Sequence, residues 1–159
     1  MSAVSYIFRR EQWIARPIDE VFAFFADAQN LEKITPPWLG FKILSMSTNS
    51  ISAGTVIRYR LRLHGIPLHW RTDIREWSPP HCFVDEQTKG PYQRWRHTHR
   101  FEVCGNRTKM IDEVQYSLPF GVFGRIVHAV KVRRDVSRIF DYRRLQIDAL
   151  FGQSGENAA

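Results

Sequence analysis

Two histidines and an aspartate carry the clearest potential for chemistry in this sequence. His97 and His99 alternate with polar residues along one strand-like segment, and Asp112 alternates with apolar residues along the next. Gly105-Asn106 between the two segments is typical of a two-residue hairpin turn. Counting outward from this turn places His99 directly opposite Asp112, so the two side chains are expected on one face of a sheet.

Three interpretations of this group are open. Asp112 can accept a hydrogen bond from His99 and fix its tautomer as a structural pair. The same pair can serve as a polar anchor, or as a general base for proton transfer, inside a cavity. Two imidazoles on one strand face can also bind a metal, with Asp85 or Glu86 as a carboxylate ligand. No other histidine or cysteine is spaced to complete a metal shell, so we expect no metal and no other cofactor.

An aromatic wall is expected around this polar group. Residues 55–72 alternate apolar side chains with polar ones on either side of His64-Gly65, which predicts a second hairpin. One apolar face of each hairpin then points toward the interior. The residues expected to line a ligand cavity there are Tyr59, Leu61, Trp70, Trp95, His97, His99, Phe101, Asp112 and Tyr116. Tryptophan and tyrosine carry polar tips, which a ligand-filled cavity accommodates more easily than a dry core does.

The C-terminal part of the sequence predicts one long amphipathic helix over residues 125–150. Its apolar stripe is expected to contribute Val136, Ile139 and Phe140 to the ligand cavity. Arg143 falls in the middle of this stripe, where a cation is unusual. It can extend past the sheet edge to solvent, bind a carboxylate such as Asp112, or bind an acidic group of a ligand.

The rest of the sequence supplies the elements that must position these residues. Residues 5–14 predict a first strand, Pro17 begins a short helix, and residues 30–38 predict a second short helix. Further strands are predicted over residues 41–47 and 82–89. With the two hairpins, this order is an α+β plan in which a curved seven-stranded antiparallel sheet wraps the long C-terminal helix.

The sequence resembles the START-like superfamily, also called SRPBCC, which includes birch-pollen-allergen-like, lipid-transfer and polyketide cyclase/dehydrase-like proteins. The stretches that carry the resemblance are Ala15–Phe22, Gly90-Pro91-Tyr92 with Trp95, His97–Phe101, Asp112–Val114 and Leu118–Gly121. In particular, the chain looks like a bacterial, polyketide cyclase-like branch of the superfamily. The resemblance implies a helix-grip fold with a hydrophobic cavity between sheet and helix. It fixes no reaction, since members range from carriers to cyclases.

Length and composition predict a single soluble domain. Residues 1–151 are expected to form one START-like ligand-binding domain, followed by a frayed tail at 152–159. The sequence has no apolar run long enough to cross a membrane and no signal-peptide pattern. Cys82 and Cys104 have neither a disulfide framework nor metal-ligand spacing. These features predict a cytoplasmic location.

The formal net charge of +7 makes acidic partners worth considering. Most of the excess is expected on the outer face of the sheet, from Arg58, Arg60, Arg62, Arg71, Arg75, Arg94, Arg96 and Arg100. This face could contact an anionic membrane or an acidic protein, although simple solubility explains it as well. Nucleic acid is disfavoured, because aromatic residues that could stack on bases lie on the other face.

Together these patterns predict reversible binding or carriage of a small hydrophobic or amphipathic molecule between the sheet and the C-terminal helix, without a requirement for catalysis. Ligand access is expected near Trp38 and Phe120, because residues 36–40 and 120–124 are apolar and contain proline or glycine pivots. The first alternative is a polyketide cyclase- or dehydratase-like enzyme in which a histidine-aspartate pair transfers protons. The second is an interaction module that uses the arginine-rich sheet face.

Overall fold

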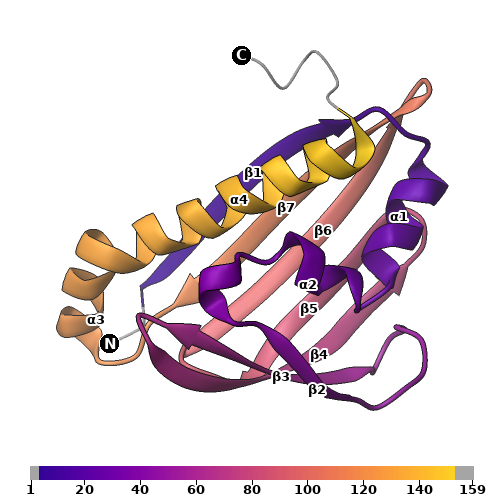
Figure 1. The fold of residues 1–159 in the computed structure, drawn as a ribbon. Helices are drawn as coiled ribbons and strands as arrows, with labels where there is room; N and C mark the ends of the chain where they lie inside the picture. The colour runs from indigo at the N-terminus through magenta and orange to yellow at the C-terminus, as the bar shows by residue number, and fades with distance from the viewer. Residues whose placement is uncertain (1–3, 153–159) are drawn as a thin grey trace.

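The structure, a computed structural model, describes residues 4–152 and confirms the predicted helix-grip architecture (Figure 1). The chain begins with β1 (Ser5–Ile14), α1 (Ile18–Ala26), α2 (Asn30–Ile34) and the 3₁₀ turn η1 (Pro37–Leu39). Six strands follow: β2 (Lys42–Met46), β3 (Val56–Leu63), β4 (Ile66–Ser78), β5 (Cys82–Lys89), β6 (Arg94–Cys104) and β7 (Arg107–Ser117). The chain then forms α3 (Gly121–Val127), the π-helical turn η2 (His128–Val132) and α4 (Arg133–Phe151). Of the tail expected at 152–159, only residue 152 lies within the described range.

All seven strands form one antiparallel sheet in the order β1-β7-β6-β5-β4-β3-β2. The sheet curves, and the C-terminal helix lies across its concave face (Figure 1). Both predicted hairpin registers are confirmed: Tyr59 pairs with Trp70, and His99 pairs with Asp112. His64 and Gly65 have φ angles of +51° and +80°, the left-handed conformation that a two-residue hairpin turn requires.

Two helix boundaries differ from the sequence prediction. The second short helix ends at Ile34, because Thr35 precedes Pro36 and takes the extended conformation that a following proline favours. The long helix begins at Gly121, so residues 121–124 form its first turn and not a loop. Gly124 allows this turn to lie close to the preceding chain, since a Cβ atom there would come within 2.3 Å of the Pro119 carbonyl oxygen.

The buried core lies between the concave face of the sheet and the helices α1 and α4. Near α1, a cluster that includes Phe22, Phe25 and Phe101 packs against Ile147 of α4. Toward the other end of α4, Val136 and Phe140 pack with side chains of β7. Within residues 4–152, no helix combines the length and the apolar character needed to cross a membrane.

Candidate functional site

A cavity of about 190 Å³ lies between the concave face of the sheet and α4. Aromatic and aliphatic side chains of β3 to β6 form most of its wall, and α4 contributes the opposite side. Among the residues predicted for the cavity, the following line it: Tyr59, Leu61, Trp70, Trp95, His97, His99, Val136, Ile139, Phe140 and Arg143. The sequence had placed the aromatic wall on this face, and the structure brings strands and helix together around it.

Phe101, Asp112 and Tyr116 point to the same face but lie outside the cavity. Phe101 is under α1, where its ring packs against those of Phe22 and Phe25 at centroid distances of 5.5 and 5.6 Å. Asp112 is buried behind the two histidines and does not reach the cavity surface. Tyr116 is covered by its neighbours, as the following contacts show. Strand alternation assigns a face, whereas the position of the helices decides which part of that face stays open.

Tyr116 belongs to a separate contact between β1, β7 and η2. Its hydroxyl is hydrogen-bonded to His128 Nε2 at 2.8 Å. The ring of His128 stacks on Tyr6 at a centroid distance of 3.4 Å. Burial lowers the pKa of His128, so its neutral form can accept this bond. The contact explains why Tyr116 is unavailable to the cavity.

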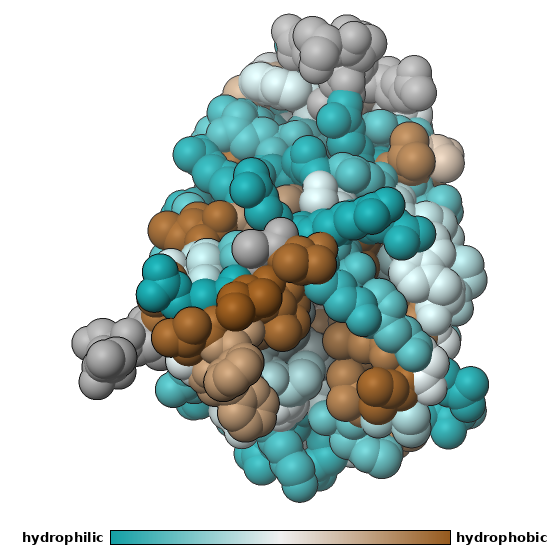
Figure 2. All heavy atoms as spheres, turned by 90° about the vertical axis from the view of Figure 1, so that its left-hand side faces the viewer, coloured by the Kyte–Doolittle hydropathy of each residue, from teal (hydrophilic) through white to brown (hydrophobic). Residues whose placement is uncertain are grey.

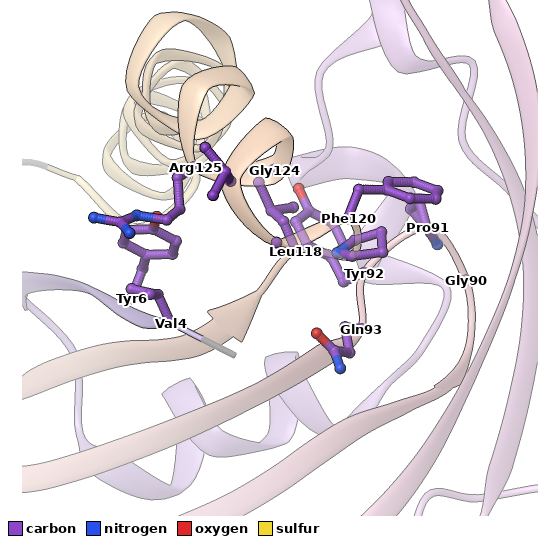
Figure 3. Close-up of a pocket in the computed structure, with 13 residues that line it drawn as sticks. Val4, Tyr6, Gly90, Pro91, Tyr92, Gln93, Leu118, Phe120, Gly124 and Arg125 are labelled. Atoms are coloured by element: carbon purple, nitrogen blue, oxygen red, sulfur yellow. The ribbon is translucent and has the colours of Figure 1, made fainter. Parts of the chain in front are cut away.

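The two residues predicted at the mouth of the cavity also lie outside its lining. Trp38 borders a separate surface hollow of about 330 Å³, with its ring edge against Tyr142. Phe120 is 82 % exposed and lines a surface cleft of about 550 Å³ between α3 and the loop before β6 (Figure 3). Tyr92, which sequence reasoning did not include among the site residues, lines both this cleft and the central cavity. It therefore stands between the cavity and the surface.

Two histidines and two carboxylates form a polar network at the floor of the cavity, with Asp112 beneath the cavity surface. His97 Nε2 donates a hydrogen bond to Asp112 Oδ1 at 2.8 Å, and His99 Nε2 donates to Asp85 Oδ2 at 2.8 Å. His99 Nδ1 lies 3.0 Å from Asp112 Oδ1, at ion-pair distance but without hydrogen-bond alignment. Asp85 lies opposite His97 in the pairing of β5 with β6, which resolves the choice between Asp85 and Glu86.

The two imidazoles differ in charge because their surroundings differ. Burial opposes the charged form of His99, but its contacts with Asp112 and Asp85 outweigh burial and raise its pKa. Burial, together with the positive charge of neighbouring His99, lowers the pKa of His97. His97 is therefore neutral at pH 7, with its proton on Nε2 and a lone pair on Nδ1. Of the two histidines, His97 can accept a proton, whereas the sequence had suggested His99 for that role.

Arg143 completes this network from α4. Its Nη2 atom lies 3.8 Å from Asp112 Oδ1, and its guanidinium lies over the rings of Phe25 and Phe140. Burial would raise the pKa of Asp112, but the charge of Arg143, the hydrogen bond from His97 and the contact with His99 hold it well below the ordinary value. The ionised Asp85 and Asp112 therefore face one permanent cation, Arg143, and one imidazole, His99, whose raised pKa favours its protonated form.

Several hydrogen-bond donors at the cavity have no acceptor. Nε and Nη2 of Arg143 and Nε1 of Trp70 are buried without a hydrogen-bond partner. The side chain of Arg143 is only 12 % exposed. Buried polar groups in proteins are nearly always hydrogen-bonded, so orphan donors that line a cavity indicate a missing acceptor. No local sequence pattern could have found this feature, because it depends on side-chain packing between β4 and α4.

Among the described residues, Asp85, His97 and His99 form a group whose ligand atoms lie within 4.8 Å of one another, close enough to share a metal ion. Two contacts oppose metal binding. Asp85 already accepts the hydrogen bond of His99, and Arg143 holds a positive charge beside the network. The expectation that the protein holds no metal stays a prediction.

Comparison with known proteins agrees with this architecture. The sequence profile of the family described as polyketide cyclase/dehydrase and lipid transport matches residues 14–139. The chain belongs to this family. A search of curated protein sequences finds no match.

Solved structures show the same fold at low sequence identity. Protein CV1439 from Chromobacterium violaceum superposes with a TM-score of 0.72 at 14 % identity, over 94 % of this chain and 99 % of the other. A norcoclaurine synthase from Thalictrum flavum gives 0.68 at 13 %, over 94 % and 98 %. The protein TTHA0849 from Thermus thermophilus gives 0.64 at 19 %, over 91 % and 99 %. At these identities the likeness concerns the fold alone.

Proposed function

We propose that this member of the family binds a small amphipathic molecule in the central cavity. The apolar part of the ligand packs against the aromatic wall, and a hydrogen-bond acceptor of the ligand faces Arg143 and Trp70. The observation that carries the proposal is the set of buried donors without acceptors on these two side chains. A ligand acceptor bound in the cavity is the partner that would satisfy them.

The size of the cavity restricts the ligand. An apolar cavity of about 150 Å³ can hold one benzene molecule, and the cavity here measures about 190 Å³. One aromatic ring with a short substituent therefore fits without a change in the structure. A longer chain or a multi-ring molecule requires the cavity to open toward the surface, for example by movement of Tyr92, which lines both the cavity and the cleft.

The charge of the network restricts the acceptor. Because Asp85 and Asp112 already face Arg143 and His99, a ligand carboxylate would be a third negative charge without a new counter-charge. An uncharged acceptor, such as a ketone, ester or amide oxygen, adds hydrogen bonds without this penalty. We therefore favour a monocyclic carbonyl compound over an organic acid.

Three probes of nearly equal size test the proposal: acetophenone, ethylbenzene and benzoate. Binding is measured by quenching of tryptophan fluorescence and by calorimetry. A hydrogen bond from a charged donor contributes about 1.5–3 kcal/mol, so acetophenone should bind at least about tenfold more tightly than ethylbenzene. Benzoate should bind more weakly than acetophenone, or bind with uptake of a proton by His97.

Matched variants locate the binding site. Trp70→Phe keeps a ring in the wall but removes the indole donor, and it should reduce the preference for acetophenone. Trp77→Phe is the control, because Trp77 packs in the core and does not line the cavity. If neither acetophenone nor ethylbenzene binds the folded protein, the cavity does not serve as a ligand site.

We infer proton transfer on the bound ligand as a second candidate function. Two observations favour it. His97 is neutral, and its Nε2–H donates to Asp112, which leaves the lone pair on Nδ1. His97 Nδ1 would take a proton from the carbon beside a ligand carbonyl, while Arg143 holds the enolate oxygen, and would then return the proton to carbon. One solved protein of the same fold is a synthase, determined with a transition-state analogue.

Exchange of hydrogen for deuterium tests this step. The methyl protons of acetophenone should exchange in D₂O faster with the protein than without it, as followed by NMR. His97→Gln should abolish the acceleration while acetophenone still binds. Equal exchange rates with and without the native protein would leave binding alone as the function.

A further inference from the structure

The end of the molecule formed by α3 and η2 exposes an unusual number of apolar side chains. They are Phe120, Val122, Phe123, Ile126, Val127 and Val130, and each is between 50 % and 82 % exposed. From residue 122 on, their spacing places them along one side of the helix. Figure 2 views the molecule from this end and shows a band of hydrophobic residues with hydrophilic residues on both sides. Single exposed apolar residues are ordinary, but a contiguous band indicates an interaction surface. We call this band the α3 face.

The charges beside the α3 face have one sign. Arg125, Lys131, Arg133 and Arg134 accompany the apolar residues, and the sequence from Leu118 to Arg134 contains no aspartate or glutamate. Within residues 4–152, none of these four cations forms an ion pair with a carboxylate. On the outer sheet face, by contrast, Arg96 lies 2.7 Å from Glu76 and Arg71 lies 3.2 Å from Asp73. The positive charge at the α3 face is therefore available to an external anion.

The backbone holds part of the α3 face in position for contact with a partner. Phe120 has a φ angle of +71°, which is unfavourable for a residue with a side chain. Packing within the molecule does little to offset this backbone cost, because 82 % of the residue is exposed. An external apolar phase would supply the burial that the chain itself does not provide.

We propose that the α3 face docks on a bilayer that contains anionic phospholipid. Helices with an apolar side and cations beside it lie in the membrane interface, with the apolar side chains at the boundary of headgroups and acyl chains. Lysine and arginine next to this boundary gain from the negative surface potential. The surface of a protein partner would carry cations as well as carboxylates. The α3 face offers no carboxylate with which those cations could pair.

The surface cleft opens at the same end of the molecule. Phe120 and Arg125 border it together with Tyr92, which also lines the central cavity (Figure 3). Docking would place the mouth of the cleft against the bilayer, from which an apolar ligand could be taken up. The docking itself requires no ligand, so its test is independent of the function proposed for the cavity.

Sedimentation with large vesicles tests the docking. Native protein should bind vesicles of phosphatidylcholine mixed with phosphatidylglycerol, and should bind pure phosphatidylcholine much more weakly. Phe123→Ser combined with Val130→Ser should weaken binding at least about tenfold, since both side chains leave water on docking. Val103→Ser with Leu145→Ser is the matched control, because these residues are 58 % and 63 % exposed on the β6–β7 hairpin and on the later part of α4.

Charge variants separate the α3 face from the arginine-rich sheet face. Each cation near an anionic surface is worth about a fivefold change in affinity. Arg133→Gln with Arg134→Gln should therefore weaken vesicle binding by roughly thirtyfold. Arg58→Gln with Arg60→Gln removes the same charge from the sheet face and should have a small effect. All four positions are exposed, so the variants are expected to fold.

Three results would overturn the proposal. The first is no binding to the anionic vesicles. The second is binding that the Phe123 and Val130 changes leave intact, or that the sheet-face changes reduce as strongly as those on α3. The third is a stable dimer in size-exclusion chromatography that Phe123→Ser dissociates, which would assign the α3 face to a second copy of the chain.

Discussion

The Asp112 carboxylate should be a major energetic contributor to the polar network, because one of its oxygens faces several donors. Asp112 Oδ1 lies 2.8 Å from His97 Nε2, 3.0 Å from His99 Nδ1 and 3.8 Å from Arg143 Nη2. Asp112→Ala removes the hydrogen-bond acceptor of buried His97, the carboxylate beside His99 Nδ1 and the counter-charge of a buried guanidinium. We therefore expect the effects of Asp112→Ala, His97→Ala and His99→Ala on stability to be strongly non-additive.

The expected magnitudes follow from the geometry of each contact. A hydrogen bond to a charged group contributes about 1.5–3 kcal/mol, so a coupling of about 2 kcal/mol is expected between Asp112 and His97. His99 Nδ1 lacks hydrogen-bond alignment toward Asp112, and a coupling of about 1 kcal/mol is expected there. Asp112→Ala alone should cost about 3–5 kcal/mol, since it leaves buried positive charge unpaired. That is a large part of the stability of a typical domain.

Double-mutant cycles measure these couplings. Urea unfolding followed by tryptophan fluorescence gives the free energy of unfolding for the native chain, each single variant and each double variant. Glu113→Ala with His97→Ala is the control cycle, because Glu113 neighbours Asp112 but points to the opposite face of β7. Its effects should add within about 0.5 kcal/mol. If Asp112→Ala does not fold, Asp112→Asn removes the charge at nearly constant volume.

The reasoning would be refuted by additivity. If Asp112 couples to His97 and His99 no more strongly than the Glu113 control does, the close approach of these groups contributes nothing specific to the fold. The network would then be three independent polar residues on a buried face, and neither the pairing of charges nor the protonation states derived from it would hold.

Three further predictions concern the same network. Because carboxylates raise the pKa of His99 above 6.5, its stabilising contribution is complete below pH 6.5 and is lost as the pH rises through the folded-state value. In urea titrations, His99→Gln should remove this alkaline decline, whose slope is at most about 1.4 kcal/mol per pH unit. Elemental analysis should find no stoichiometric transition metal, and chelator should leave the melting temperature unchanged; one metal per chain that is lost on His97→Ala would contradict this. Arg143→Lys keeps the charge beside Asp112, so stability should change little, but calorimetry should show a reduced preference for acetophenone over ethylbenzene; an unchanged preference would argue against Arg143 as the donor.

The register of the sheet could be predicted because two-residue turns fix the count of cross-strand pairs. Once His64-Gly65 is placed at the turn, every pair of that hairpin follows. The connection over residues 90–93 has no such turn, and the sequence left Asp85 and Glu86 as alternatives opposite His97. The structure places Asp85 there. Prediction of register therefore depends on the chemistry of the turns more than on the strands.

The chemistry of the site could be predicted only in part. The register correctly placed His99 opposite Asp112, but side-chain rotation gives Asp112 its hydrogen bond from His97. The limits of the cavity depend on helical segments outside the sheet. Helix α1 covers Phe101, and His128 of η2 forms a hydrogen bond with the Tyr116 hydroxyl. These contacts join elements far apart in the chain, so no local pattern encodes them.

Arg143 lies on the apolar stripe of α4 and faces the buried polar network on the concave side of the sheet. Its guanidinium lies over the rings of Phe25 and Phe140, which lets a cation occupy the apolar side of α4. Its Nη2 faces Asp112, whose buried charge would be strongly unfavourable without a cation from the facing layer. Since Nε and Nη2 are buried without a hydrogen-bond acceptor, the residue that neutralises the network is also the one that a ligand would contact. A ligand anion would compete with Asp112 for Arg143, whereas an uncharged carbonyl oxygen would accept a hydrogen bond and leave the ion pair in place.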